Sequence, residues 1–168
     1  MSRYQLEGIV GDNPAMGSIV PNIAKGRFAE LYNRVKLGDP SAARLYVIPI
    51  AAGAVTDAQL LDADDFAAII TLGATERTAN GWNRKTIAAA DIVSLAPDDT
   101  NDRMPTDIAD QSWTPTNAGD TVSDLVVCYA SVASPTNAQL TPITIVDFVV
   151  TPASVLETAA FTDFARAS

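Results

Sequence analysis

Histidine is missing from the 168-residue sequence, and cysteine occurs only once, at Cys128. Without histidine, the chain lacks the commonest general base, the commonest metal ligand and the base of Ser-His and Cys-His nucleophile pairs. A single cysteine cannot form an internal disulfide. Because Cys128 stands between Val127 and Tyr129 in an apolar run, we expect a buried structural thiol. We therefore expect no catalytic residues, and a protein that is not an enzyme.

Charged and aromatic residues are also scarce, at 18% and 7% of the chain, and the net charge is −9. Residues 1–44 carry six basic and four acidic residues, whereas residues 45–168 carry five basic and sixteen acidic ones. Phosphate contacts need clustered Lys and Arg, so an acidic body argues against nucleic acid as a direct partner. The mildly basic front end could lie against an acidic surface, although a short segment acquires such an excess by chance as well.

Long hydrophobic runs are absent, since the longest are about half of the ~20 residues that a membrane-spanning helix needs. The first 20 residues also lack a basic start followed by an unbroken apolar run, so they do not resemble a signal peptide. We expect synthesis in a cytoplasm and no membrane partner.

Glycine and proline interrupt the first 26 residues, which we expect to form an extended N-terminal arm. The arm cannot bury enough apolar surface to be ordered alone, so it packs either on its own body or on another subunit. Residues 27–168 are expected to form a single β-rich domain.

Two helices and one strand are expected in the first half of this domain. Phe28, Leu31, Tyr32 and Val35 share one helical face within residues 27–37, and Gly38 is a stop signal. Thr56 and Gln59 match a capping box that opens a second helix over about residues 57–71. Residues 44–51 read as a strand, in which Pro49 favours an edge or a bend. A loop is expected over residues 73–81.

Strands dominate the second half. We expect them over residues 83–97, 103–113, 121–132 and 143–150, with a hairpin turn at Asp98–Asp102 between the first two. The last two are apolar on both faces, which is typical of strands covered on both sides. Phe161 and Phe164 offer a last apolar anchor. The expected fold is mainly β with minor α, an antiparallel β-sandwich or barrel-like body with one or two short helices.

Two carboxylate clusters and two tryptophans are the remaining candidates for a site. Asp98, Asp99, Asn101 and Asp102 could hold calcium, but the EF-hand glycine and glutamate are missing and turn chemistry accounts for these residue types. Asp62, Asp64 and Asp65 are expected near the start of the second helix, where the helix dipole favours negative charge. Trp82 and Trp113 could stack on sugars, but core positions are expected for both. No metal or cofactor site is expected.

Several motifs resemble those of small virion proteins from tailed bacteriophages, especially phages of actinobacteria. The resemblance covers Lys25 to Ser168 and rests on Asn83-Arg84-Lys85, the Asp98–Arg103 turn, Asp110-Gln111-Ser112-Trp113, Asp124–Tyr129 and Asp147-Phe148. Residues 1–24 lie outside it.

The resemblance implies a head-associated structural protein, namely a capsid decoration or minor capsid protein. Such a protein binds the outer surface of the major capsid protein lattice on the virion exterior and stabilises it, as a homo-oligomer such as a trimer. A tail or connector structural protein and a carbohydrate-binding module for host attachment are the alternatives.

Overall fold

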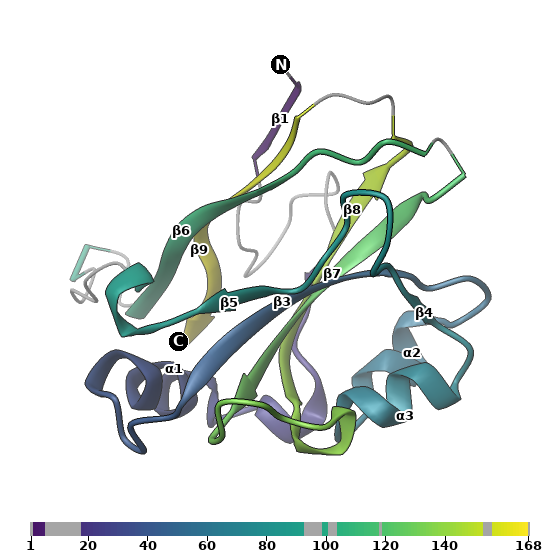
Figure 1. The fold of residues 1–168 in the computed structure, drawn as a ribbon. Helices are drawn as coiled ribbons and strands as arrows, with labels where there is room; N and C mark the ends of the chain where they lie inside the picture. The colour runs from purple at the N-terminus through teal and green to yellow at the C-terminus, as the bar shows by residue number, and fades with distance from the viewer. Residues whose placement is uncertain are drawn as a thin grey trace.

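The fold of the chain is mainly β, with two sheets and three short α-helices among the described residues (Figure 1). The computed structural model describes residues 2–5, 18–92, 99–100, 104–117, 119–152 and 156–167, with the side chains of 2–5, 104–105 and 160–167 left aside. The expected sandwich-like β-body with minor α is confirmed.

The larger sheet has six strands, of which β3 is central. Its spatial order is β2 (Ser18–Ile19), β8 (Thr141–Val150), β7 (Val122–Ala130), β3 (Arg44–Ala51) and β4 (Thr75–Glu76), with β5 (Lys85–Ile87) also paired to β3. All these pairs are antiparallel. The expected strands at 44–51, 121–132 and 143–150 are confirmed within a few residues.

The smaller sheet brings the two ends of the chain together. Its order is β1 (Ser2–Gln5), β9 (Glu157–Ala167) and β6 (Met104–Trp113). β1 runs parallel to β9, whereas β6 runs antiparallel to it with two register shifts. The tail that was expected to supply an apolar anchor therefore forms the middle strand of this sheet.

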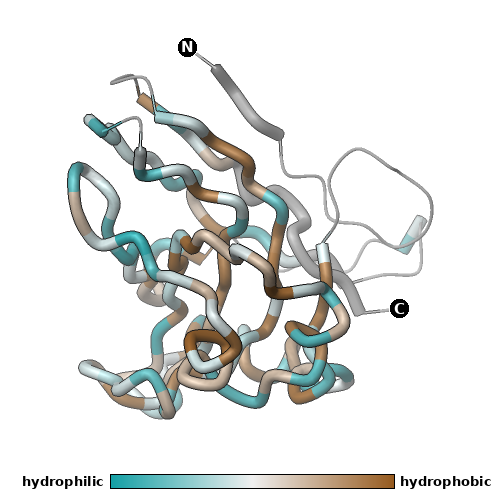
Figure 2. Tube along the Cα trace, turned by 90° about the vertical axis from the view of Figure 1, so that its right-hand side faces the viewer, coloured by the Kyte–Doolittle hydropathy of each residue, from teal (hydrophilic) through white to brown (hydrophobic). Residues whose placement is uncertain are grey.

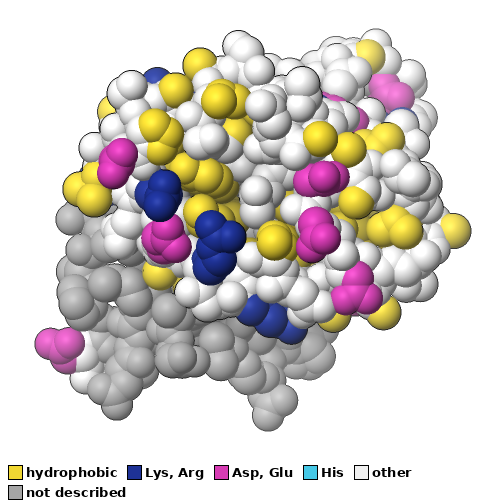
Figure 3. Space-filling view, turned by 90° about the horizontal axis from the view of Figure 1, so that it is seen from below, with side chains coloured by type: hydrophobic (Ala, Val, Ile, Leu, Met, Phe, Trp, Pro, Cys, Tyr) yellow, Lys and Arg dark blue, Asp and Glu magenta, His cyan; other side chains and the backbone are white. Residues whose placement is uncertain are grey.

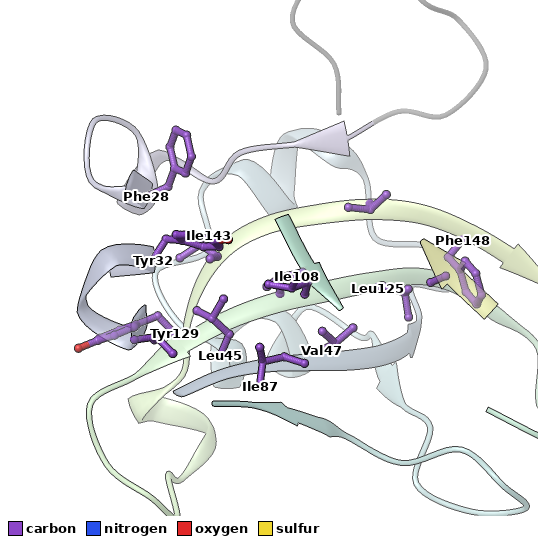
Figure 4. Close-up of a cluster of buried hydrophobic side chains, with 14 of the residues drawn as sticks. Phe28, Tyr32, Leu45, Val47, Ile87, Ile108, Leu125, Tyr129, Ile143 and Phe148 are labelled. Atoms are coloured by element: carbon purple, nitrogen blue, oxygen red, sulfur yellow. The ribbon is translucent and has the colours of Figure 1, made fainter. Parts of the chain in front are cut away.

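Two hydrophobic cores use opposite faces of the six-stranded sheet. Leu45 and Val47 of β3 face the first core, which the smaller sheet and α1 (Phe28–Leu37) close, whereas Ile48 and Ile50 face the second core. Helices α2 (Asp57–Leu61) and α3 (Phe66–Thr71) cover the second core. Figure 4 shows side chains of the first core, and Figure 2 shows hydrophobic stretches along the strands. The strands of this sheet are apolar on both faces because the sheet is covered on both sides.

Helix α1 begins and ends where its sequence signals lie. Its buried side chains are the four that share the apolar face, and Gly38 adopts the left-handed conformation (φ 65°) that terminates the helix. The Tyr32 hydroxyl donates to the Asp107 carbonyl and accepts from the Asp107 amide, which ties the helix to β6.

Three sequence expectations about element bounds were wrong. The helix expected over residues 57–71 is divided into α2 and α3, because Asp65 acts as an N-cap and its side chain accepts from the Ala68 amide. Of the strand expected over residues 83–97, the described part to Ile92 contains β5, followed by a 3₁₀ turn, η2 (Ala89–Asp91). The loop expected over residues 73–81 contains β4.

Pro49 does not lie in an edge strand, because β3 has partners on both sides. On one side Pro49 pairs in register with Leu125 of β7. On the other side it falls between the residues that pair with β5 and those that pair with β4, and its carbonyl accepts from the Arg77 amide. A proline is tolerated here because no ladder donor is required at this point.

The expected hairpin at Asp98–Asp102 stays a prediction, because residues 93–98 and 101–103 are not described. On either side of it β5 pairs with β3 and β6 pairs with β9, and among the described residues an antiparallel bridge, Ile92 to Ile108, connects the two segments. Asp99 and Thr100 form an exposed turn, whereas Asp98, Asn101 and Asp102 lie outside the described residues.

Candidate functional site

The tryptophans are buried and offer no exposed ring to a sugar. Trp82 and Trp113 are each 2% exposed, with ring centroids 5.7 Å apart, and Phe148 lies 6.1 Å beyond Trp113. Both indole N–H groups are satisfied by backbone carbonyls, Trp82 by Asp120 at 3.0 Å and Trp113 by Asn83 at 2.8 Å. The core positions expected for both residues are confirmed.

Cys128 is fully buried on the face of β7 that belongs to the second core. Burial raises the pKa of its thiol far above the ordinary range, and the nearby Arg84 guanidinium lowers the pKa only in part. The thiolate that nucleophilic chemistry requires is therefore suppressed. The expected buried structural thiol is confirmed.

The first carboxylate cluster separates two helices, and its last member begins the second of them. Asp62 ends α2 and accepts a hydrogen bond from the side-chain amide of Asn22 at 2.7 Å, whereas Asp65 caps the start of α3. The expected position of Asp62, Asp64 and Asp65 on the early turns of a long helix is wrong, because that helix is divided at this point. Across the described ranges, no group of three or more His, Cys, Asp or Glu side chains could hold a metal ion.

The second cluster, proposed as a calcium alternative, is mostly outside the described residues. Asp98, Asn101 and Asp102 have no described position, and Asp99 is exposed. The calcium alternative therefore stays a sequence-based hypothesis.

An ion pair and a hydrogen bond of Arg84 hold the segment that carries the Asn83-Arg84-Lys85 motif. Arg84 makes a two-pronged ion pair with Glu76, at 2.5 and 2.7 Å, and donates to the Asn137 side chain at 2.7 Å. Its guanidinium also lies 5.3 Å from the ring centroid of Phe66. The hydrogen bond to Glu76 raises the pKa of Arg84, which favours the charged guanidinium. This arginine has a structural task.

Residues from three of the sequence motifs meet around Trp113. Asn83 accepts from its indole N–H, Lys85 places its ammonium 5.3 Å from the ring centroid, and Phe148 packs against it. Asp147, which precedes Phe148, pairs in register with Asp124 of β7 on the opposite face of the sheet. Folding therefore brings together motif residues that are distant in sequence.

One pair of carboxylates was not identified from the sequence. Asp124 is 8% exposed, and the Ser123 hydroxyl donates to its Oδ2 at 2.5 Å while accepting from the Ala52 amide at 2.8 Å. Burial raises the pKa of Asp124, the Ser123 hydrogen bond lowers it, and the Asp147 and Asp57 carboxylates raise it further. A signal existed in the sequence, because an aspartate interrupts each of two otherwise apolar runs, VSDLVV and TIVDFV.

The N-terminal arm lies partly on its own body. β1 adds to the edge of β9, and β2 adds to β8, where the Thr144 hydroxyl donates to the Ile19 carbonyl at 3.3 Å. The following 3₁₀ turn, η1 (Asn22–Ala24), buries Ala24 completely, and Val20 and Ile23 pack on the first core. Residues 18–24 therefore contribute to the core, whereas β1 adds backbone pairs to a single strand.

The face seen from below combines the α1 side and the α2–α3 side (Figure 3). Leu37 is 78% exposed at the end of α1, which also carries Arg34 and Lys36. On the other side, a shallow groove of about 450 Å³ between α2 and α3 is lined mainly by apolar atoms of Gln59, Asp62, Ala63, Ala68, Thr71 and Leu72. The surface therefore has a mildly basic end and an acidic, partly apolar end.

No protein-family model, curated protein or solved structure matches the chain. Among the residues that the structure describes, no helix has the length and hydropathy required to cross a membrane.

Proposed function

We propose that the chain is a structural virion protein of a tailed phage that binds the outer surface of the major capsid protein lattice and stabilises it. The resemblance of its motifs to head-associated phage proteins carries this proposal. In support, Asn83, Lys85 and Phe148 of the motifs pack around Trp113, and Arg84 forms an ion pair with Glu76. A structural protein needs such contacts for a rigid body and requires no catalytic chemistry from these residues.

The gain from such binding follows from mass action. A ligand that binds the assembled lattice, and not the separate capsid subunits, stabilises the assembled state. The acidic body, with sixteen acidic and five basic residues over 45–168, suits a position outside the shell, away from DNA. A symmetric lattice also favours a symmetric homo-oligomer such as a trimer as the bound form.

The N-terminal strand is the segment that we assign to the contact with the lattice. β1 is an edge strand with four backbone pairs to β9 on one side, so its other side is open to strand addition within the described residues. Arg3 gives this strand a positive charge. Removal of residues 1–17 spares β2 and η1, which pack on the body. This truncation therefore tests the role of β1 more specifically than removal of the whole arm.

The test is co-sedimentation of the purified protein with capsid shells assembled from the major capsid protein of the same phage. The full chain should sediment with the shells and raise their thermal disruption temperature. The chain lacking residues 1–17 should stay in the supernatant while melting as one cooperative unit. A matched control keeps β1 and replaces residues 6–17 by a Gly/Ser segment of equal length, and it should bind.

Two outcomes would overturn the proposal or its interface. Absence of the full chain from shells, together with few copies in purified virions, would assign it to the tail or connector, where a ring holds far fewer subunits than a lattice. Full binding by the truncated chain would remove β1 from the interface. The carbohydrate-binding alternative receives no support from Trp82 and Trp113, since both rings are buried.

A further inference from the structure

Two neighbouring carboxylates, the buried Asp124 and the half-buried Asp147, lie where four elements meet at the end of the six-stranded sheet. Asp124 of β7 and Asp147 of β8 are cross-strand partners, next to a register shift between Val122 and Asp124. On its other side Asp124 is in register with Ile50 of β3, and Asp57 stands in the first turn of α2. Both aspartates share the sheet face of Val126 and Ile145, which is covered by the second core.

The surroundings of Asp124 favour its protonated form. Its side chain is almost fully removed from water, and the charged groups that face it are the carboxylates of Asp147 and Asp57. Within the described part of the chain, no lysine or arginine contributes to its environment. Arg77, which follows β4, is directed to the Thr121 carbonyl at 2.9 Å and to Asp120 at 3.9 Å. Two carboxylates so close together cannot both ionise without mutual repulsion.

A proton between the two side chains removes this repulsion. The Asp147 carboxyl is a hydrogen-bond partner of Asp124, so the proton held by Asp124 is donated to Asp147. Ser123 extends the network, because its hydroxyl donates to Asp124 and accepts from the amide of Ala52, where β3 ends and the chain turns toward α2. The paired carboxyls thus connect the β7–β8 ladder to the loop that positions α2.

We propose that Asp124 and Asp147 form a proton-sharing latch that fastens β7, β8 and the β3–α2 loop at low pH and loosens as the pH rises. Loss of the shared proton leaves two negative charges side by side, one of them on the buried Asp124, with the exposed Asp57 carboxylate nearby. The hydrogen bond between the carboxyls is then replaced by repulsion, and Ser123 transmits the change to the loop at Ala52. This inference is independent of the proposed virion role.

The direction of the effect follows from linkage. Burial and the neighbouring carboxylates hold the pKa of Asp124 above its unfolded value, which is about 3.9 for an aspartate. The stabilising contribution is complete below the unfolded value and is lost as the pH rises through the raised folded value. Because the chain has no histidine, few other groups titrate just above the ordinary carboxyl range. A slope of stability with pH above that range is therefore readily assigned to Asp124.

The decisive variant is Asp124→Asn, whose amide can donate a permanent hydrogen bond to Asp147. Thermal unfolding of the full chain would be followed from pH 4 to pH 9. We expect the wild-type melting temperature to fall as the pH rises, and the variant to lose this slope and melt several degrees higher than the wild type at pH 8. Asp110→Asn, an exposed position on β6, is the matched control and should keep the wild-type slope.

A second measurement uses the unmodified protein. The side-chain carboxyl carbon of Asp124 should titrate above the ordinary aspartate range by NMR. Exchange of the Ala52 amide should accelerate with pH by more than the intrinsic tenfold per pH unit in the same window. An ordinary titration of Asp124, or an Asp124→Asn slope equal to that of the wild type, would overturn the latch.

Discussion

At the scale of the residue, Gly81 occupies a position that no other residue fits. It has a φ of 94°, in the left-handed half of conformational space, where a side chain is strained. A Cβ at this position would lie far inside van der Waals contact of the Thr114 carbonyl oxygen. The same contact region holds Trp82 against Trp113, so the loop and the aromatic cluster depend on one another.

Gly81→Ala should therefore lower the free energy of unfolding by more than the ~1 kcal/mol of an ordinary glycine replacement. Chemical denaturation monitored by tryptophan fluorescence measures the loss, because Trp82 is adjacent. Gly119→Ala is the control, since its Cβ would meet only the Asn117 side chain at 3.5 Å and its φ is not positive. Equal stability of both variants would show that the loop adapts freely.

At the scale of the element, the break between α2 and α3 depends on one side chain. Asp65 caps α3 by accepting from the Ala68 amide at 2.8 Å, and Phe66 behind it is fully buried. Asp64 is exposed and has no such task in the described structure.

Asp65→Ala should cost about 1 kcal/mol of unfolding free energy, as the loss of an N-cap does. Asp64→Ala, one residue away and equal in charge, should cost far less. The two variants are compared by denaturant titration at equal ionic strength. A larger loss of unfolding free energy for Asp64→Ala would mean that the negative charge, and not the cap, determines where α3 begins.

Elements with one strong local signal were predictable, whereas those decided by distant partners were not. The apolar face of α1 and its stop signal at Gly38 could be recognised in the local sequence. The same is true of the apolar pattern on both faces of β7 and β8. The division at Asp65 was missed because a continuous apolar face, from Leu60 to Ile70, suggested one helix. The short length of β5 could not be predicted from the sequence, because the positions of β3 and β6 determine where its pairing ends.

The same distinction applies to the candidate sites. Burial of Cys128, Trp82 and Trp113 was predictable from apolar neighbours. The pairing of Asp124 with Asp147 was not, because the register between the two strands depends on two register shifts in the β7–β8 ladder. A turn-forming role explained Asp98–Asp102 from composition alone, and it stays a prediction because Asp98, Asn101 and Asp102 lie outside the described residues.

At the scale of the whole molecule, both cores share one sheet. Neighbouring residues of β7, such as Val126 and Val127, belong to different cores, so neither core can open without disturbing the other's support. Because the two cores share one sheet, we expect the protein to unfold in a single cooperative transition.

Cys128 provides the means to observe it, because its thiol is fully buried in this sheet. Labelling by a disulfide reagent under native conditions should occur only through global opening, at a rate that tracks the unfolding equilibrium of each variant. Gly81→Ala should therefore accelerate labelling in proportion to its loss of stability, and Gly119→Ala should leave the rate unchanged. Rapid labelling of the native wild type would reveal local opening of β7.

The parallel pairing of β1 with β9 has a consequence for the order of events during protein synthesis. Ser2 pairs with Glu157, so β1 has no partner in this sheet until β9 has been synthesised. Until then its backbone donors and acceptors are open to other chains. A nascent chain stalled before residue 157 would therefore present β1 to any neighbouring polypeptide.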